Sequence, residues 1–180
     1  IKTTKEEWSQ IKNTEPKWNK DKTRQEETPT SQAQQTETDE IRLYTDGSCP
    51  ENSKVNTQNS PAGWGVAIYT KQDNNTENER QLKMGIFGPV ETKHNAQHFL
   101  GAELGSNNTG ELTAICEGLK WLLEHEQTNK PAAFYYDSKY AAKITTGEYN
   151  AESNKYLAAK ARTLLQQVKA QREIRFEHIK

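Results

Sequence analysis

Hydrophobic and polar residues change their spacing several times along the chain, and each spacing predicts a different element. Three short segments have the alternation and composition of β-strands, at 41–46, 64–70 and 82–87. Residues 109–125 follow with hydrophobic side chains at helical spacing, which predicts an amphipathic helix capped by Asn108 or Thr109. No regular pattern occurs between 89 and 106.

The remaining residues predict further strands and helices in alternation. A short apolar strand is expected at 132–136, helices at 137–144 and 150–169, and a final alternating strand at 174–179. Three strands followed by helix, strand, two helices and strand indicate an α/β or α+β protein with a mixed sheet. We expect an α/β fold in which five strands, three antiparallel and then two added by parallel crossovers, are flanked by helices in three layers.

Composition divides the chain into two parts. Only five of the first 40 residues are hydrophobic, whereas the whole chain of 180 residues is 32% hydrophobic. We therefore predict a polar, disordered tail or linker over 1–40 and a single domain over 41–180.

Charge and hydrophobicity exclude several classes of protein. With 24 basic and 25 acidic residues, the chain is not a strongly basic nucleic-acid binder. It contains no apolar stretch long enough to span a membrane and no secretory signal. Its two cysteines, Cys49 and Cys116, do not have the number or spacing of a zinc module. We expect an intracellular protein that does not bind membranes, without distinguishing nucleus, cytoplasm or organelle.

Three acidic residues lie where the carboxyl ends of strands meet a helix. Asp46 follows the first predicted strand and begins an Asp46-Gly47-Ser48 turn, Asp137 follows the strand at 132–136, and Glu111 lies in the first turn of the main helix. Each has an ordinary alternative, because Asp is common in turns and Glu favours a helix N-terminus. Together, three converging carboxylates would repel one another unless divalent cations held them, and hard oxygen ligands suit Mg²⁺ or Mn²⁺.

Several motifs resemble type 1 ribonuclease H, in that family's order and over residues 41–180. They are YTDGSCPEN, AGWGVAI, GSNNTGELTAICEGLKWL, YYDSKYA, GEYNAESNKYL and IRFEHIK. The resemblance implies a five-stranded mixed sheet with helices on both faces. It also implies cleavage of the RNA strand of RNA–DNA hybrids with two Mg²⁺ ions, for which Mn²⁺ can substitute.

The resemblance also implies roles for individual residues. Asp46, Glu111 and Asp137 would be the catalytic metal ligands, with Asp46 bridging both ions. Asn52, Asn107 and Asn108 would contact the RNA near the first strand loop and the helix start, with Cys49 at the loop. Ser106 and Asn154 match the region where the family binds a phosphate of the DNA strand. Asn side chains suit 2′-hydroxyl groups because they donate and accept hydrogen bonds, although an Asn pair before a helix is also typical of capping.

The sequence departs from the family in two places. It lacks the basic, Trp-containing insertion that many members use to grip the hybrid, because 141–154 runs on without it. It ends at Lys180, before the family's Gly-His loop and a last helix with a fourth carboxylate, and it starts at Ile1 rather than Met. We therefore expect a fragment of a longer protein, truncated in its active site and poorly active as it stands.

Two alternatives to a hybrid-specific endoribonuclease remain open. One is a non-catalytic hybrid-binding module, or a ribonuclease H domain tethered within a retroelement polyprotein. The other is a different nuclease or transferase on the same fold. In each case we expect a monomeric domain, alone or within a longer polypeptide. His94 and His98, four residues apart, are expected to be polar residues on the surface rather than metal ligands. His178 is not expected to be a catalytic residue.

Overall fold

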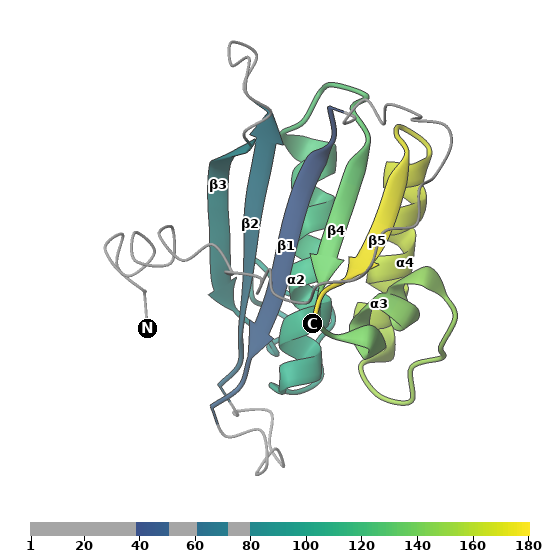
Figure 1. The fold of residues 1–180 in the computed structure, drawn as a ribbon. Helices are drawn as coiled ribbons and strands as arrows, with labels where there is room; N and C mark the ends of the chain where they lie inside the picture. The colour runs from purple at the N-terminus through teal and green to yellow at the C-terminus, as the bar shows by residue number, and fades with distance from the viewer. Residues whose placement is uncertain (1–38, 51–60, 72–79) are drawn as a thin grey trace, which may run out of the picture. The chain divides into compact units, whose positions relative to one another are not determined.

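The computed structural model describes residues 39–50, 61–71 and 80–180. The predicted tail lies outside the described residues except for Asp39 and Glu40, and so does Asn52. The elements, in chain order, are β1 (Ile41–Ser48), β2 (Gly63–Lys71), β3 (Arg80–Pro89), α2 (Asn107–Glu124), β4 (Ala132–Tyr136), α3 (Lys139–Thr146), α4 (Lys155–Lys169) and β5 (Ile174–His178) (Figure 1).

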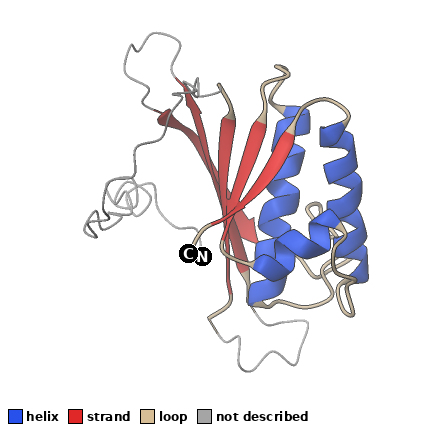
Figure 2. Cartoon of the chain, turned by 45° about the vertical axis from the view of Figure 1, so that its right-hand side comes forward, coloured by secondary structure: helices blue, strands red, loops and turns tan. Residues whose placement is uncertain are grey.

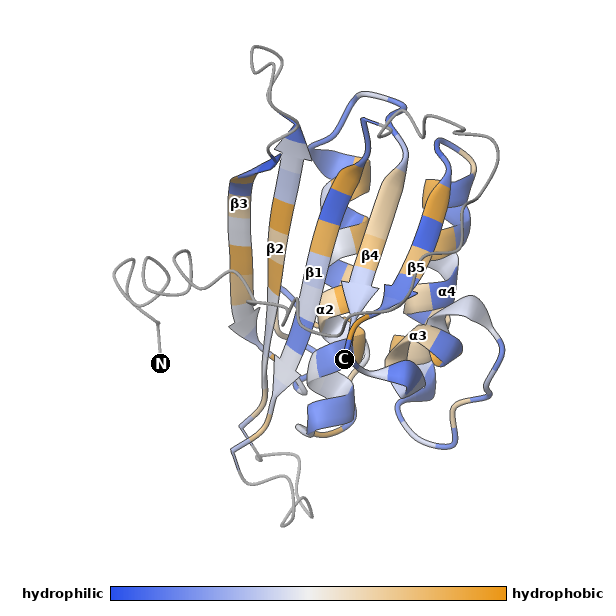
Figure 3. Ribbon diagram, in the orientation of Figure 1, coloured by the Kyte–Doolittle hydropathy of each residue, from blue (hydrophilic) through white to orange (hydrophobic). Residues whose placement is uncertain are grey.

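The five strands form one mixed sheet in the order β3-β2-β1-β4-β5. Strands β1, β2 and β3 pair antiparallel, whereas β4 pairs parallel with β1 and β5 pairs parallel with β4. This confirms the predicted α/β sheet of three antiparallel strands and two parallel additions. Hydrophobic and hydrophilic residues alternate along β1 and β5, as Figure 3 shows, because only one side of each strand faces the core.

Strand β1 is longer than its hydrophobic pattern predicts. The sequence indicates a turn at Asp46-Gly47-Ser48, but all three residues remain in the strand and pair with Gly65, Trp64 and Gly63. The turn prediction was therefore wrong. Alternation could not reveal this, because the last residues of β1 are polar and pack against a helix start instead of the core.

The three described helices lie on one face of the sheet (Figure 2). The core between the two layers contains Leu43, Phe134 and Leu119, each fully buried. Within the described residues, the predicted helical layer on the other face is therefore absent. That face contains instead half-buried aromatic side chains, among them Tyr44 stacked on Tyr135 with ring centroids 4.7 Å apart.

The three helices start at other residues than the sequence indicates, and α3 begins at Lys139 instead of residue 137. Ser106, rather than Asn108 or Thr109, is the N-cap of α2: its Oγ accepts a hydrogen bond from the Thr109 N–H, and Thr109 Oγ1 accepts one from the Ser106 N–H. Helix α4 starts at Lys155 instead of residue 150, because Asn154 has a left-handed conformation with φ of 54°. A helix cannot continue through that conformation.

No helix in the described ranges is long and apolar enough to cross a membrane.

Candidate active site

The structure brings together the three acidic residues that the sequence singles out. One carboxylate oxygen from each of Asp46, Glu111 and Asp137 lies within 4.8 Å of those of the other two. Asp46 and Asp137 are exposed, whereas Glu111 is buried with 7% of its surface accessible. The cluster is therefore open to solvent on one side and buried on the other.

Two of the three acids are placed by parallel strand pairing. Tyr44 of β1 is in register with Tyr135 of β4, and each aspartate comes two residues later in its strand direction. His178 at the end of β5 lies next to them, with Nε2 3.2 Å from the carbonyl oxygen of Asp137. The carboxyl ends of three neighbouring strands thus form one edge of the site, as is usual in sheets with parallel strands.

Glycines bring the third acid close to the sheet. A Cβ atom added to Gly47 would lie 2.1 Å from the Glu111 backbone nitrogen, and one added to Gly110 would lie 2.5 Å from the Gly63 carbonyl oxygen. Only glycine allows α2 to pack this closely on β1 and β2. Because Gly110 precedes Glu111 directly, the contact places the glutamate beside Asp46. Helix α2 begins at Asn107, so Glu111 is its fifth residue and not in the first turn.

The electrostatics of the cluster are unfavourable in the absence of a cation. Burial, together with the charges of Asp137 and Asp46, raises the pKa of Glu111 to about 8, although a hydrogen bond with the Gly47 backbone opposes the shift. Burial and the charge of Asp137 also raise the pKa of Asp46. Like charges at this separation favour a bound proton or a bound metal ion.

The donor set fits a hard divalent cation. All three groups offer carboxylate oxygens, the ligands preferred by Mg²⁺ and Mn²⁺. The raised pKa values point the same way, because a cation would stabilise the charged forms that the protein itself disfavours.

The predicted nucleic-acid contacts at the start of α2 lie next to this cluster. Because Ser106 caps the helix, Asn107 and Asn108 are its first two residues, and both are exposed. Capping therefore does not account for the Asn pair. Ser106 itself is half-buried, and its hydroxyl takes part in the capping contacts with Thr109.

The other predicted contacts are in different environments. Asn154 is buried, and its Oδ1 accepts a hydrogen bond from the Glu103 N–H at 2.8 Å. Its Nδ2 lies 3.4 Å from Ser153 Oγ. Cys49 is a buried free thiol. Sequence reasoning did not identify Gly47, Gly110 or Glu103, whose roles depend on contacts between distant parts of the chain.

A comparison with protein families identifies the family of the chain. The family model for RNase H matches residues 37–180 of the chain. No curated protein is significantly similar in sequence.

Solved structures with a similar fold are RNase H domains. The N-terminal RNase H domain of a Mycobacterium tuberculosis protein is 20% identical with a TM-score of 0.54, covering 78% of this chain and 81% of that one. RNase H1 from Halobacterium salinarum is 15% identical with a TM-score of 0.53, covering 78% and 85%. LC11-RNase H1, solved in complex with an RNA/DNA hybrid, is 20% identical with a TM-score of 0.53, covering 78% and 85%. At these identities the likeness shows a shared fold.

Proposed function

Because the chain belongs to the RNase H family, we propose that it is an endoribonuclease that hydrolyses the RNA strand of RNA–DNA hybrids. The observation that carries the proposal is the convergence of Asp46, Glu111 and Asp137 within 4.8 Å at the carboxyl ends of β1 and β4. The structure of LC11-RNase H1 with a bound RNA/DNA hybrid supports the choice of substrate.

We assign the three carboxylates as ligands of two Mg²⁺ ions, with Mn²⁺ as a possible replacement. The chemistry that such ions supply when bound is activation of a water molecule and stabilisation of charge on the leaving oxygen. Glu111 provides a buried, water-poor side of the site, and the exposed aspartates provide the side open to substrate. A charge stabilises an opposite charge more strongly in such a partly desolvated site than in bulk water.

Recognition of RNA is assigned to the exposed start of α2. Asn107 and Asn108 precede Glu111 on the same helix, at its exposed N-terminal end. An amide both donates and accepts hydrogen bonds, as does the 2′-hydroxyl that distinguishes RNA from DNA. Both are exposed, and the capping contacts of the helix are made by Ser106 and Thr109.

A cleavage assay tests the proposal directly. The chain is incubated with end-labelled RNA, either annealed to DNA, annealed to RNA or single-stranded, in Mg²⁺ or Mn²⁺. Cleavage is expected only in the RNA–DNA hybrid. The matched variant Asp46→Asn keeps the side-chain shape and removes one charge, so cleavage should fall by at least about a hundredfold, the usual cost of losing one electrostatic group at a reaction centre.

Stability measurements separate loss of chemistry from loss of fold. Asp46→Asn removes a charge from a repulsive cluster, so its free energy of unfolding without metal should equal or exceed that of the wild type. Equal cleavage of single-stranded RNA, or full activity of Asp46→Asn, would contradict the assignment. Tight hybrid binding with no cleavage in either metal would instead favour a non-catalytic binding module.

A further inference from the structure

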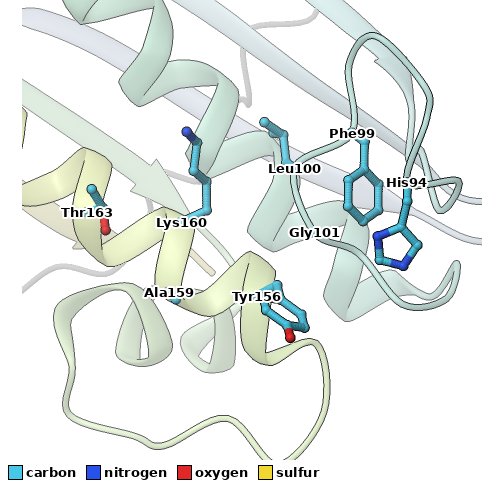
Figure 4. A pocket seen from close by; sticks show the side chains of 8 residues that line it. All are labelled: His94, Phe99, Leu100, Gly101, Tyr156, Ala159, Lys160 and Thr163. Carbon is cyan, nitrogen blue, oxygen red and sulfur yellow. The ribbon is translucent and has the colours of Figure 1, made fainter.

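The segment of residues 101–106, which leads into α2, packs against the first turn of α4, although the two are distant in sequence. Gly101 makes the closest approach: it has φ of 106°, and a Cβ atom there would lie 2.8 Å from both the Leu157 backbone nitrogen and Tyr156 Cβ. Figure 4 shows Gly101 beside this turn of α4, which bears Tyr156. The next residue, Ala102, is buried in the core. The segment is therefore anchored on α4 just before α2 begins.

Two hydrogen bonds join Glu103 to the start of α4. The Glu103 N–H donates to Asn154 Oδ1 at 2.8 Å, and the Lys155 N–H donates to Glu103 Oε1 at 3.3 Å. Such reciprocal bonds, from each side chain to a backbone N–H of the other segment, are typical of a capping box, which normally forms within one helix start. Here the two halves come from distant parts of the chain. We call them the Glu103–Asn154 pair.

The conformation and burial of Asn154 direct its side chain toward Glu103. Asn154 is the N-cap of α4, but its side chain makes no capping hydrogen bond within its own helix. Its backbone is left-handed, which Asn tolerates better than most residues. The residue is only 8% exposed, and its Nδ2 lies 3.4 Å from Ser153 Oγ. Asn154 therefore offers little surface to a ligand.

The Glu103–Asn154 pair lies close to the cap of α2. Ser106 follows Glu103 by three residues, which span at most about 10 Å even in an extended chain. Ser106 in turn fixes the first turn of α2, because its Oγ and its carbonyl oxygen accept hydrogen bonds from backbone N–H groups of that turn. The exposed Asn107 and Asn108 belong to the same turn. Their placement therefore depends on the contact with α4.

Glu111 is positioned by a different contact. Gly110, directly before it, packs against the Gly63 carbonyl oxygen and Gly47 of the sheet. The position of Glu111 thus depends on β1 and β2, whereas that of the asparagines one turn earlier depends on α4 as well. A change at the Glu103–Asn154 pair should therefore affect the asparagines more than Glu111.

We propose that the Glu103–Asn154 pair positions the first turn of α2 for recognition of the RNA strand. In this assignment Asn154 is a positioning residue that acts through Glu103 and Ser106 and does not touch the nucleic acid. The assignment differs from the phosphate contact that the family resemblance implies for Asn154. The proposal rests on the proposed function, because it takes the asparagines of α2 as the contacts to RNA.

Two variants of Asn154 and one control separate the hydrogen bond from the backbone conformation. Asn154→Gly keeps the left-handed conformation and removes the carboxamide, whereas Asn154→Asp keeps an acceptor oxygen and also tolerates that conformation. Ser153→Ala removes the exposed hydroxyl beside Asn154 Nδ2 and serves as the control.

Binding is measured at one salt concentration, without divalent cations, for a fluorescent RNA–DNA hybrid and a DNA duplex of the same sequence. Asn154→Gly should raise the Kd for the hybrid about fivefold, the effect of one hydrogen bond of ordinary strength. The Kd for the DNA duplex should change less than about twofold, because the asparagines are assigned to the 2′-hydroxyl. In the cleavage assay KM should rise with the hybrid Kd while kcat is nearly constant, since Gly110 holds Glu111 in place. Ser153→Ala should change none of these values.

Asn154→Asp distinguishes positioning from direct contact. A carboxylate can accept the hydrogen bond of the Glu103 N–H, and its charge is favourable at a helix N-terminus. Its hybrid Kd should therefore lie closer to that of the wild type than the Kd of Asn154→Gly does. If the side chain contacted a phosphate, the added negative charge would repel it, and Asn154→Asp would bind more weakly than Asn154→Gly. That order would overturn the proposal.

A double-mutant cycle with the asparagines of α2 is the second test. When Asn107→Ala and Asn108→Ala are already present, Asn154→Gly should have little further effect on hybrid affinity, because the contacts that it positions are gone. The same loss in both backgrounds would show that Asn154 contributes independently of the asparagines, which would overturn the proposal.

Hydrogen exchange separates the failure of this proposal from the failure of the proposed function. Amides of residues 103–109 should exchange faster in Asn154→Gly than in the wild type, while those of β1 stay protected and show that the domain is folded. Unchanged exchange, or equal hybrid affinity in all variants of a chain that cleaves hybrids, would overturn the positioning role alone. The predicted order of affinities in a chain that does not cleave would support the pair and refute the nuclease. A wild-type chain without preference for the hybrid would overturn both.

Discussion

Two buried glutamates near opposite ends of β1 have opposite surroundings. Glu40 directly precedes the strand and is 4% exposed, while Glu111 packs beside the end of the strand and is 7% exposed. Glu40 accepts three hydrogen bonds from Arg175, two from Nη2 at 2.8 and 3.0 Å and one from Nε at 3.1 Å, and it accepts one from Arg42 Nε at 3.1 Å. Glu111 faces Asp46 and Asp137 instead.

The pKa of each glutamate reflects that difference. Burial alone would raise the pKa of Glu40, but the hydrogen bonds and charges of Arg175 and Arg42 together hold it below its ordinary value. At Glu111, burial and neighbouring acids act in the same direction and raise the pKa to about 8. A buried carboxylate with its cations supplied by the protein is structural. One whose neighbours are acids holds a proton unless a cation stabilises its charged form, and perturbed pKa values of this kind are typical of functional sites.

The largest expected effect is a pH dependence of the free energy of unfolding that Glu111 causes and Glu40 does not. Without metal, the folded protein keeps a proton on Glu111 between pH 4.5 and about 8, whereas the unfolded chain releases it. The free energy of unfolding should therefore fall as pH rises through this window, by up to about 1.4 kcal/mol per pH unit. Urea titrations with EDTA or Mg²⁺ measure this slope, and Mg²⁺ should reduce it.

Glu111→Gln serves as the control for that slope. The variant cannot ionise, so its metal-free stability should change much less with pH above 4.5, and Mg²⁺ should stabilise it less than the wild type. A wild-type chain whose stability is flat over this range would show that Glu111 is not perturbed. The two glutamates would then not differ in the way that their surroundings predict.

Removal of the charge at Glu40 should have the next largest effect. Glu40→Gln leaves Arg42 and Arg175 facing a neutral amide, and we expect a loss of about 2 kcal/mol at pH 7, below the full cost for a deeply buried pair because the arginines reach solvent. Glu177→Gln removes an exposed partner of the same Arg175 and should cost less than about 0.5 kcal/mol. Equal losses in the two variants, measured by urea unfolding, would mean that burial of Glu40 does not matter.

The smallest effect is expected when the Arg175 guanidinium is replaced by the ammonium group of lysine. Arg175→Lys keeps the charge but cannot donate two parallel hydrogen bonds to Glu40 and removes the guanidinium that lies over the Tyr135 ring. Because Arg42 remains, a loss of about 1 kcal/mol is expected in the same unfolding assay. A loss as large as that of Glu40→Gln would show that Arg175 alone neutralises the glutamate.

Local patterns in the sequence predicted the sheet, the central helix and the three acids, because alternation and helical spacing depend on neighbouring residues. Positions that depend on tertiary contacts were not predictable in the same way. Gly47 lies in a motif that is typical of a turn, yet its lack of a side chain allows α2 to approach β1. Glu40 belongs to the polar segment by composition, but folding buries it against arginines from β1, β3 and β5. The segment between 89 and 106 has no periodicity, so its contacts with the start of α4 were not predicted.

The close contact between Gly47 and the start of α2 also has a consequence for folding. The residues it joins are distant in sequence, so chain-closure entropy must be overcome before the acidic cluster can exist. The unfolded chain consequently has no preassembled site, so a divalent cation bound at the cluster would stabilise the folded state by mass action.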